Sequence, residues 1–390
     1  MMQSIAKCHH GLMRSSTRRS STQCRLLSSS MQVLENTEAV AQKVLASLSS
    51  IPCPSDDATK PAFLLRQCPV ANQHGPTPLA CAPDLARQFQ VAQLYIKDER
   101  NRLGMGSFKA LGAAYAIASD ASKAPGRTYV TASAGNHGLS VAAGAKAFGA
   151  KAIIYLAESV APSFATRLEQ QFGATVIREG TTYEESMQAA EHAVSQNMNH
   201  DQSMVLLSDS SWLGYSFHYP LRVMEGYLVL MHEAVQQIPQ PPTHLFLQAG
   251  VGGMAAACAA YARKVWGDKT RIIVVEPQEA PALLESMVAG KPVIAKGDLS
   301  CMGRLDCKEP SLIALKGLAR DADYFITISE QSGQDGVECA ETAGYKTTPS
   351  GAAGLAGVME VTTAQQNQRN TLGLTAESRV MIVLTEAPVS

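Results

Sequence analysis

The chain has 390 residues, of which 46% are hydrophobic and 17% are charged, and its formal net charge is −1. This length suffices for one large or two medium domains with sizeable cores. The near-zero charge gives no field that would attract nucleic acid or an anionic membrane, and no apolar stretch approaches the length needed to span a bilayer. We therefore expect a globular protein whose partners include neither nucleic acid nor membrane.

The nine cysteines are scattered along the chain without a CxxC pair or a Cys/His cluster at metal-ligand spacing. An odd number without a framework argues against a fold built on disulfides and for a reducing compartment. We expect no metal site.

The first 30 residues differ in composition from the rest of the chain. They contain eight serines and five Lys or Arg residues, and no acidic residue precedes Glu35. This composition is typical of an organellar transit peptide, so we expect residues 1–30 to direct import into mitochondria. The alternatives are a disordered basic tail or a start ahead of Met31, in a cytoplasmic protein.

From Leu94 onward, short apolar runs alternate with helix-like segments. We expect strands at 94–99, 128–133, 151–157, 174–180, 243–248, 271–277 and 379–387. We expect helices at 108–121, 135–149, 163–173, 183–196 and 254–267. This alternation is typical of βαβ units, so the predicted fold class is α/β, with a mostly parallel sheet covered by helices on both faces.

Three glycine-rich turns follow predicted strands, at Gly104–Lys109, Ser133–Gly138 and Gly250–Met254. Ligands bind at the carboxyl ends of parallel strands, so these turns are candidates for one shared site. Lys109 is unusual because the residues that follow it are small or apolar until Ser119. Such a lysine either packs its stem and extends its amine to water, or holds the amine in a pocket for chemistry.

The third turn has the pattern of an anion-binding loop. Its glycines allow backbone N–H groups to converge on a phosphate, and the start of the following helix adds a favourable dipole. The same stretch also fits G-x-G-x-x-A at Gly250, Gly252 and Ala255, with Glu276 ending the next strand where a ribose-binding acid would stand. A nicotinamide-dependent oxidoreductase is therefore a competing interpretation, although it explains neither Lys109 nor the second turn.

Four motifs occur in the order GSFKALGAA, TASAGNHGLSVA, QAGVGGMAA and VLTEA. Together they resemble the fold-type II pyridoxal-phosphate (PLP) enzymes, the group that contains threonine dehydratase and the β subunit of tryptophan synthase. Residues 207–227 and 297–315 are similar to segments of diaminopropionate ammonia-lyase, and the resemblance extends from about Pro76 to Pro388. It implies two domains, each with a mostly parallel twisted sheet. Residues 31–104 and 226–390 would form the large PLP-binding domain, and 105–225 a smaller mobile domain.

The resemblance also implies roles for individual residues. Lys109 would hold PLP as a Schiff base and then shuttle the Cα proton, which requires a neutral amine. Asn136 would bond the phenolate oxygen of PLP, and the hydroxyl of Thr385 would face its pyridine nitrogen. The substrate carboxylate would bind Ser133, Ala134 and Gly135, and the cofactor phosphate would bind Gly250, Val251, Gly252, Gly253 and Met254. Read without the resemblance, Asn136 could cap a helix, Thr385 could be an ordinary strand-end threonine, and His137 is assigned no chemistry.

The second turn departs from the pattern of diaminopropionate ammonia-lyases at Ala134. That subfamily typically has an aspartate here, which acts on the D-substrate, whereas SAGNHG is closer to the loop of threonine dehydratases. Either the D-isomer is a poor substrate, or another acid such as Asp209 is the second catalytic base. Asp209 could equally be a helix cap or a structural acid.

The resemblance implies α,β-elimination of ammonia from 2,3-diaminopropionate by a homodimeric enzyme, giving pyruvate and ammonia. A serine/threonine dehydratase is the nearest alternative, and an NAD-binding oxidoreductase or a non-catalytic PLP-binding protein are weaker ones.

Overall fold

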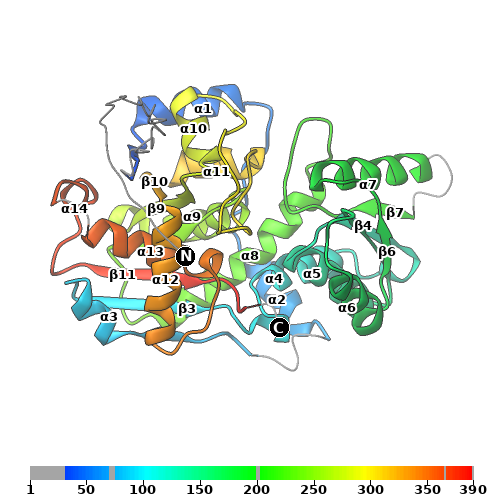
Figure 1. The fold of residues 1–390 in the computed structure, drawn as a ribbon, viewed down its shortest axis with the longest axis horizontal. Coiled ribbons are helices and arrows are strands. Elements are labelled where there is room, and N and C mark those ends of the chain that lie inside the picture. Colours follow the sequence, from blue (N-terminus) through cyan, green and yellow to red (C-terminus); the bar gives the residue numbers. More distant parts are fainter. Residues whose placement is uncertain (1–30, 70–74, 199–202, 364–365, 389–390) are drawn as a thin grey trace, which may run out of the picture. The chain divides into compact units, whose positions relative to one another are not determined.

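The structure, a computed structural model, describes residues 31–69, 75–198, 203–363 and 366–388 (Figure 1). The predicted transit segment, residues 1–30, lies outside the described residues. Two sheets organise the described part of the chain, one with seven strands and one with four. This arrangement confirms the predicted α/β class.

The larger sheet has the strand order β1-β10-β9-β8-β11-β3-β2. Its inner pairings are parallel, and only the two edge strands pair antiparallel. In chain order its strands are β1 (Val33–Glu35), β2 (Leu79–Cys81), β3 (Gln93–Asp98), β8 (His244–Gln248), β9 (Arg271–Pro277), β10 (Tyr324–Ile328) and β11 (Arg379–Leu384).

The smaller sheet is wholly parallel, with the order β6-β5-β4-β7. Its strands are β4 (Thr128–Ala132), β5 (Lys151–Leu156), β6 (Thr175–Arg178) and β7 (Met204–Leu206). The smaller sheet falls within the predicted domain of residues 105–225, and the larger sheet takes strands from both flanks. The domain boundaries themselves stay a prediction.

The helices are α1 (Glu38–Ser47), α2 (Thr59–Gln67), α3 (Pro83–Gln88), α4 (Lys109–Ala118), α5 (Asn136–Ala147), α6 (Pro162–Phe172), α7 (Tyr183–Met198), α8 (His218–Gln237), α9 (Gly253–Trp266), α10 (Ala282–Ala289), α11 (Leu312–Asp321), α12 (Glu330–Thr342), α13 (Pro349–Thr363) and α14 (Gln366–Leu372). Their ends follow ordinary rules. For example, α6 begins with a proline at its first turn and ends at Gly173, whose φ is +69°.

Helices cover both faces of the larger sheet, and the alternation along β8 explains why. Leu245 and Leu247 belong to a core that includes residues of α9 and α11, whereas Phe246 belongs to a second core that includes α13. Successive strand residues point to opposite faces, so a buried strand must supply apolar side chains to both. The smaller sheet also has apolar side chains on both faces. Tyr129 belongs to the core that includes α5, and Val130 belongs to the core that includes α7.

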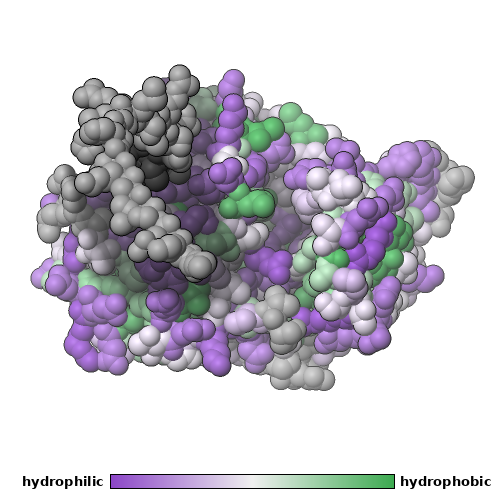
Figure 2. All heavy atoms as spheres, viewed as in Figure 1, coloured by the Kyte–Doolittle hydropathy of each residue, from purple (hydrophilic) through white to green (hydrophobic). Residues whose placement is uncertain are grey.

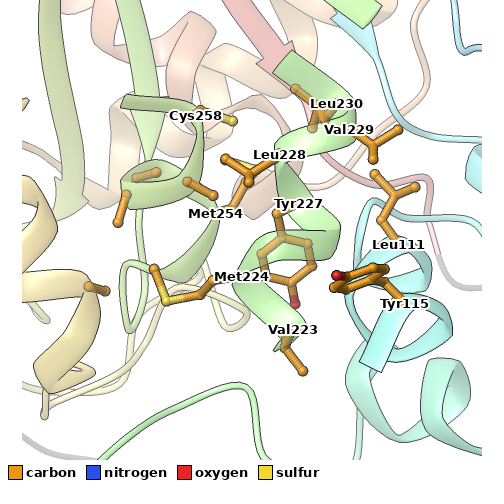
Figure 3. Close-up of a cluster of buried hydrophobic side chains, with 14 of the residues drawn as sticks. Leu111, Tyr115, Val223, Met224, Tyr227, Leu228, Val229, Leu230, Met254 and Cys258 are labelled. Carbon is orange, nitrogen blue, oxygen red and sulfur yellow. The ribbon is translucent and has the colours of Figure 1, made fainter. Parts of the chain in front are cut away.

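Helix α8 packs against both α4 and α9 (Figure 3). The close-up labels Leu111 and Tyr115 of α4, Tyr227 and Met224 of α8, and Met254 of α9 within one apolar cluster. Two glycines bring α4 and α8 together. A Cβ at Gly112 would lie 2.6 Å from the Tyr227 ring, and one at Gly226 would lie 2.5 Å from the carbonyl oxygen of Leu111.

Hydrophilic side chains cover much of the visible face, with apolar ones scattered among them (Figure 2). Among the described residues, the structure contains no helix with the length and apolar character that crossing a membrane requires.

Candidate active site

The candidate site lies where strands of both sheets end. Residues before Lys109 pair with residues after β11: the amide of Phe108 donates to the Thr385 carbonyl at 3.1 Å, and Ser107 forms an isolated bridge with Glu386. The amide of Ala387 donates to the Gly106 carbonyl at 2.9 Å. The first and last predicted motifs are therefore in direct contact.

Lys109 is the first residue of α4, and its ammonium forms an ion pair with Asp209, which follows β7. Both side chains are largely buried, at 23% and 16% exposure. Burial lowers the pKa of Lys109, but the Asp209 carboxylate and the Tyr227 hydroxyl raise it, and the net shift is upward. Burial likewise raises the pKa of Asp209, but the charge of Lys109 lowers it below its ordinary range. The pair is therefore ionised at neutral pH.

The loop between β3 and Lys109 has an unusual backbone. Leu103, Gly104 and Gly106 all have positive φ, and for Leu103, at +52°, this conformation is strained. A buried ionic cluster at the start of the loop holds it in place. Arg102 donates to Glu99 at 2.7 Å and to Glu233 of α8 at 2.8 Å.

Asn136 begins α5, but its side chain does not cap that helix. Its amide nitrogen donates instead to the Glu386 carboxylate, which also accepts from the Thr348 hydroxyl at 2.6 Å. Burial raises the pKa of Glu386, and its hydrogen bonds and the charges of Arg304 and Lys109 offset part of the shift. Glu386 and Thr348 were not predicted as site residues from the sequence. The position of Glu386 directly after Thr385 was the only available signal.

The turn predicted to bind the substrate carboxylate, Ser133–Gly135, lies between β4 and α5. The Gly135 amide donates a hydrogen bond to the Ser133 hydroxyl at 3.2 Å. This amide therefore already has an acceptor within the turn. The carbonyl of Ala134 accepts from the guanidinium of Arg304 at 3.4 Å. Sequence reasoning missed Arg304, because its loop is remote in the chain.

The turn Gly250–Met254 connects β8 to α9, as predicted. Gly252 has φ of +96°, which favours glycine, and the carbonyl of Val251 accepts from the Ser311 amide at 3.0 Å. The first amides of a helix have no partner within it. Those of Gly253 and Met254 also have no acceptor elsewhere in the described part of the chain. The turn therefore offers backbone donors to an anion.

Thr385 is buried at the end of β11, and its hydroxyl accepts a long bond of 3.4 Å from the Gln248 amide. No described residue uses its hydroxyl hydrogen. Two further buried hydroxyls, those of Ser107 and Tyr227, have no hydrogen-bond partner among the described residues. Ser107 lies two residues from Lys109, and Tyr227 packs edge-on against Phe108 with ring centroids 5.0 Å apart.

Glu276 does not take the role that the oxidoreductase interpretation requires. Its buried carboxylate accepts from the amides of Leu283 and Leu284 at the start of α10, both at 2.8 Å. Burial raises the pKa of Glu276 to about 8. The residue therefore caps a helix, which does not support the competing oxidoreductase interpretation. His137 is buried, and its Nε2 lies 2.8 Å from the Leu207 carbonyl, consistent with a structural role.

These residues suit PLP. Unpartnered amides stand at the start of α9 for a phosphate, and a hydroxyl with a free hydrogen stands at Thr385 for a ring nitrogen. A lysine for an aldehyde and unpartnered hydroxyls for a polar ligand complete the set.

Comparison with known proteins gives a consistent picture. The family described as "Pyridoxal-phosphate dependent enzyme" matches residues 70–386. Diaminopropionate ammonia-lyase of Escherichia coli K12 is 31% identical over 368 residues, which cover 84% of this chain and 90% of the relative. L-threonine ammonia-lyase of Geobacter sulfurreducens is 28% identical over 240 residues, covering 61% and 55%.

Solved structures are similar over most of the chain. The E. coli diaminopropionate ammonia-lyase in complex with an aminoacrylate-PLP azomethine reaction intermediate superposes with a TM-score of 0.80 and 28% identity, covering 93% of this chain and 94% of that one. Threonine deaminase isoform 2 of Solanum lycopersicum has a TM-score of 0.72 at 18% identity, covering 87% and 92%, and shares the fold.

Proposed function

Because the chain belongs to the pyridoxal-phosphate dependent enzyme family, we propose that it eliminates ammonia from 2,3-diaminopropionate. It is a PLP-dependent carbon–nitrogen lyase of fold type II. The observation that carries the substrate-level proposal is the Lys109–Asp209 pair, held beside unpartnered donors where both sheets end.

PLP, when bound, supplies an electron sink for the charge that develops at the substrate Cα. The amides of Gly253 and Met254 would hold its phosphate, Thr385 would face its ring nitrogen, and Asn136 would face its ring oxygen. The Asn136 amide must then either divide its two N–H donors between the cofactor and Glu386 or break its hydrogen bond to Glu386. A hydroxyl at Thr385 need not keep the ring nitrogen protonated, which suits an elimination whose leaving group carries away the charge.

Asp209 governs the proton on Lys109. An amine must be neutral to attack a carbonyl, and the ion pair keeps the Lys109 Nζ protonated. The Asp209 carboxylate is in hydrogen-bond contact with that nitrogen, so it orients the amine and itself stays ionised. Once neutral, the Lys109 Nζ serves as the base that removes the proton from Cα.

The overall reaction balances with one water. Loss of the Cα proton and of the β-amino group as ammonia leaves 2-aminoacrylate. Water then hydrolyses its imine tautomer to pyruvate and a second ammonia. The Lys109–Asp209 pair is largely buried, which would limit water beside it during the elimination.

The stereochemistry follows from Ala134, whose methyl group cannot transfer a proton. Asp209 is the carboxylate paired with Lys109, and we assign to it the second base function. The D-isomer should therefore react through Asp209, and the L-isomer through Lys109.

The test is product release by the purified full-length chain with PLP. The substrates are D- and L-2,3-diaminopropionate, L-serine and L-threonine, followed as pyruvate or, for threonine, 2-oxobutyrate. We expect both diaminopropionate isomers to react, Lys109→Ala to abolish both reactions, and Asp209→Asn to impair the D-isomer more. Pyruvate from neither isomer would contradict the proposal.

A serine/threonine dehydratase is the second candidate, favoured by Ala134 and by the similarity to L-threonine ammonia-lyase. Turnover of the hydroxy amino acids alone would establish it.

We also propose a homodimer in the mitochondrion. The composition of residues 1–30 supports import, and light scattering and cell fractionation of a tagged full-length chain test the two points. A monomer, or a cytosolic full-length chain, would contradict them.

A further inference from the structure

Arg304 lies in the segment between α10 and α11, and its backbone is fixed to the larger-sheet part of the site. Its amide donates to the Ser350 hydroxyl at 3.0 Å. Its carbonyl oxygen lies 3.2 Å from the position that a Cβ would take at Gly250, in the proposed phosphate-binding turn. The start of its side chain is therefore held in place.

The side chain of Arg304 extends to the other sheet. Its Nη1 donates to the carbonyl of Ala134 at 3.4 Å, in the turn that follows β4. Arg304 thus spans from the phosphate-binding turn to the turn proposed to bind the substrate carboxylate.

Gly135 makes room for this guanidinium. A Cβ at Gly135 would lie 2.3 Å from the Arg304 Nη1 and 3.0 Å from its Cζ. The backbone of Gly135 is extended, with φ of −144° and ψ of −158°, a conformation open to any residue. An alanine at this position would therefore require the guanidinium to move, although the backbone would accept it.

Most N–H donors of the Arg304 guanidinium have no acceptor among the described residues. Arginine carries five N–H donors, and the weak bond to Ala134 uses one of them. Arg304 forms no ion pair with any described residue. The positive charge of Arg304 lowers the pKa of Glu386, but the Glu386 carboxylate already accepts hydrogen bonds from Asn136 and Thr348.

From this geometry we propose that Arg304 binds the α-carboxylate of the amino-acid substrate, together with the turn at Ser133–Gly135. The inference rests on the proposed function, because it assigns one part of the same site. A planar guanidinium can grip a carboxylate with two parallel hydrogen bonds, which a lysine cannot do. Ala134 contributes no charge that would repel this anion.

The first experiment measures KM and kcat for diaminopropionate in the full-length holoenzyme and in its Arg304→Ala and Arg304→Lys variants. We expect Arg304→Ala to raise KM by about 10- to 100-fold, the range for a lost charge-assisted bond, with kcat changed less than about threefold. Arg304→Lys should restore part of the loss. The surface variant Arg87→Ala, which removes a largely exposed guanidinium, is the matched control and should leave both constants unchanged.

A second experiment works even if diaminopropionate is not the substrate. L-alanine has no leaving group at Cβ, and ethylamine is the same molecule without its carboxylate. Their dissociation constants come from the change in cofactor absorbance of the holoenzyme. Arg304→Ala should weaken L-alanine by about 10- to 100-fold and leave ethylamine unchanged.

Gly135→Ala should reproduce the L-alanine defect, because the added methyl displaces the guanidinium. Equal L-alanine affinity in wild type and Arg304→Ala would overturn the inference, as would an equal loss for ethylamine. A lost alanine preference without diaminopropionate turnover would support Arg304 and contradict the proposed substrate.

Discussion

Two lysines twelve residues apart, Lys97 and Lys109, each face a glutamate or aspartate, yet their surroundings differ. Lys97 lies in β3 with no exposure, and its ammonium donates to Glu233 at 2.8 Å, the Thr77 carbonyl at 2.7 Å and Gln237 at 3.0 Å. All three donors of that ammonium are used. Lys109 keeps 23% of its side chain exposed and has one ionic partner, Asp209.

Their pKa values shift in opposite directions. Burial lowers the pKa of Lys97 more than Glu233 and Glu99 raise it, so its net shift is downward. The pKa of Lys109 moves upward because Asp209 outweighs burial. A lowered pKa alone would therefore point to the wrong lysine. A catalytic lysine needs a partner it can release and an open position beside it, whereas Lys97 is enclosed by fixed partners.

The sharpest test of this contrast is activity. We expect Lys109→Ala to lower turnover at least about 10⁴-fold, or about 5.4 kcal/mol, because no other described amine takes its place. Its thermal midpoint should fall less than that of Lys97→Met, since Asp209 keeps 16% of its side chain exposed whereas Lys97 is fully buried. Turnover within tenfold of wild type would refute the assignment of Lys109.

Lys97 should show the reverse pattern. Lys97→Met removes one positive charge from a buried cluster in which Arg102 and Lys97 balance Glu99 and Glu233. We expect unfolding to become easier by about 3–5 kcal/mol, while the folded fraction keeps its kcat. The double variant Lys97→Met/Glu233→Gln restores charge balance and should be more stable than Lys97→Met. Chemical denaturation measures both, and equal stability of all three proteins would contradict this account.

The contrast also explains how far sequence alone could lead. The alternating segments from Leu94 predicted the parallel strands well, because buried βαβ units have strong local patterns. Helix α8 and strands β7 and β10 were not predicted. β7 has three residues, and α8 is apolar on several sides because it packs against α2, α4 and α9. Neither signal is distinctive in a single sequence.

Within the site, motifs located Lys109, Asn136, Thr385 and the Gly250–Met254 turn in one region, but not their partners. Glu386 and Arg304 act through contacts between segments more than 100 residues apart. Such contacts leave no local pattern. Glu276 is the opposite case. Its spacing from the G-x-G-x-x-A motif fits a ribose-binding acid, but in the structure its carboxylate caps a helix.

Helix α8 connects the two lysines, because it carries Glu233 and also packs against α4, which begins at Lys109. Gly112→Ala should destabilise the fold by about 1–3 kcal/mol through overpacking, since its methyl would lie 2.6 Å from Tyr227 and 2.7 Å from Val223. It should also lower kcat by displacing Lys109. Gly126→Ala is the matched control, because a Cβ there meets nothing within 4 Å. Equal effects of both changes on stability and kcat would refute this packing role.

The smallest expected effect is on the stability of the protein without PLP. Its pH dependence shows whether the Lys109–Asp209 pair is ionised or neutral. In this form the largely buried Lys109–Asp209 pair should make a net contribution of about 1 kcal/mol or less, because desolvation offsets most of its attraction. Because the pKa of Asp209 is lowered from 3.8, its stabilisation is complete above pH 3.8 and is lost as pH falls through the lower folded value. Because the pKa of Lys109 is raised from 10.5, its stabilisation is complete below pH 10.5 and is lost as pH rises through the higher folded value. The difference in thermal midpoint between wild type and Asp209→Asn should therefore be constant from about pH 5 to pH 9.

Asp84→Asn, which breaks an exposed pair with Arg87, should change the midpoint less. A difference that changes between about pH 6 and pH 8 would mean that another group, such as the neighbouring His137, controls the charge of the pair.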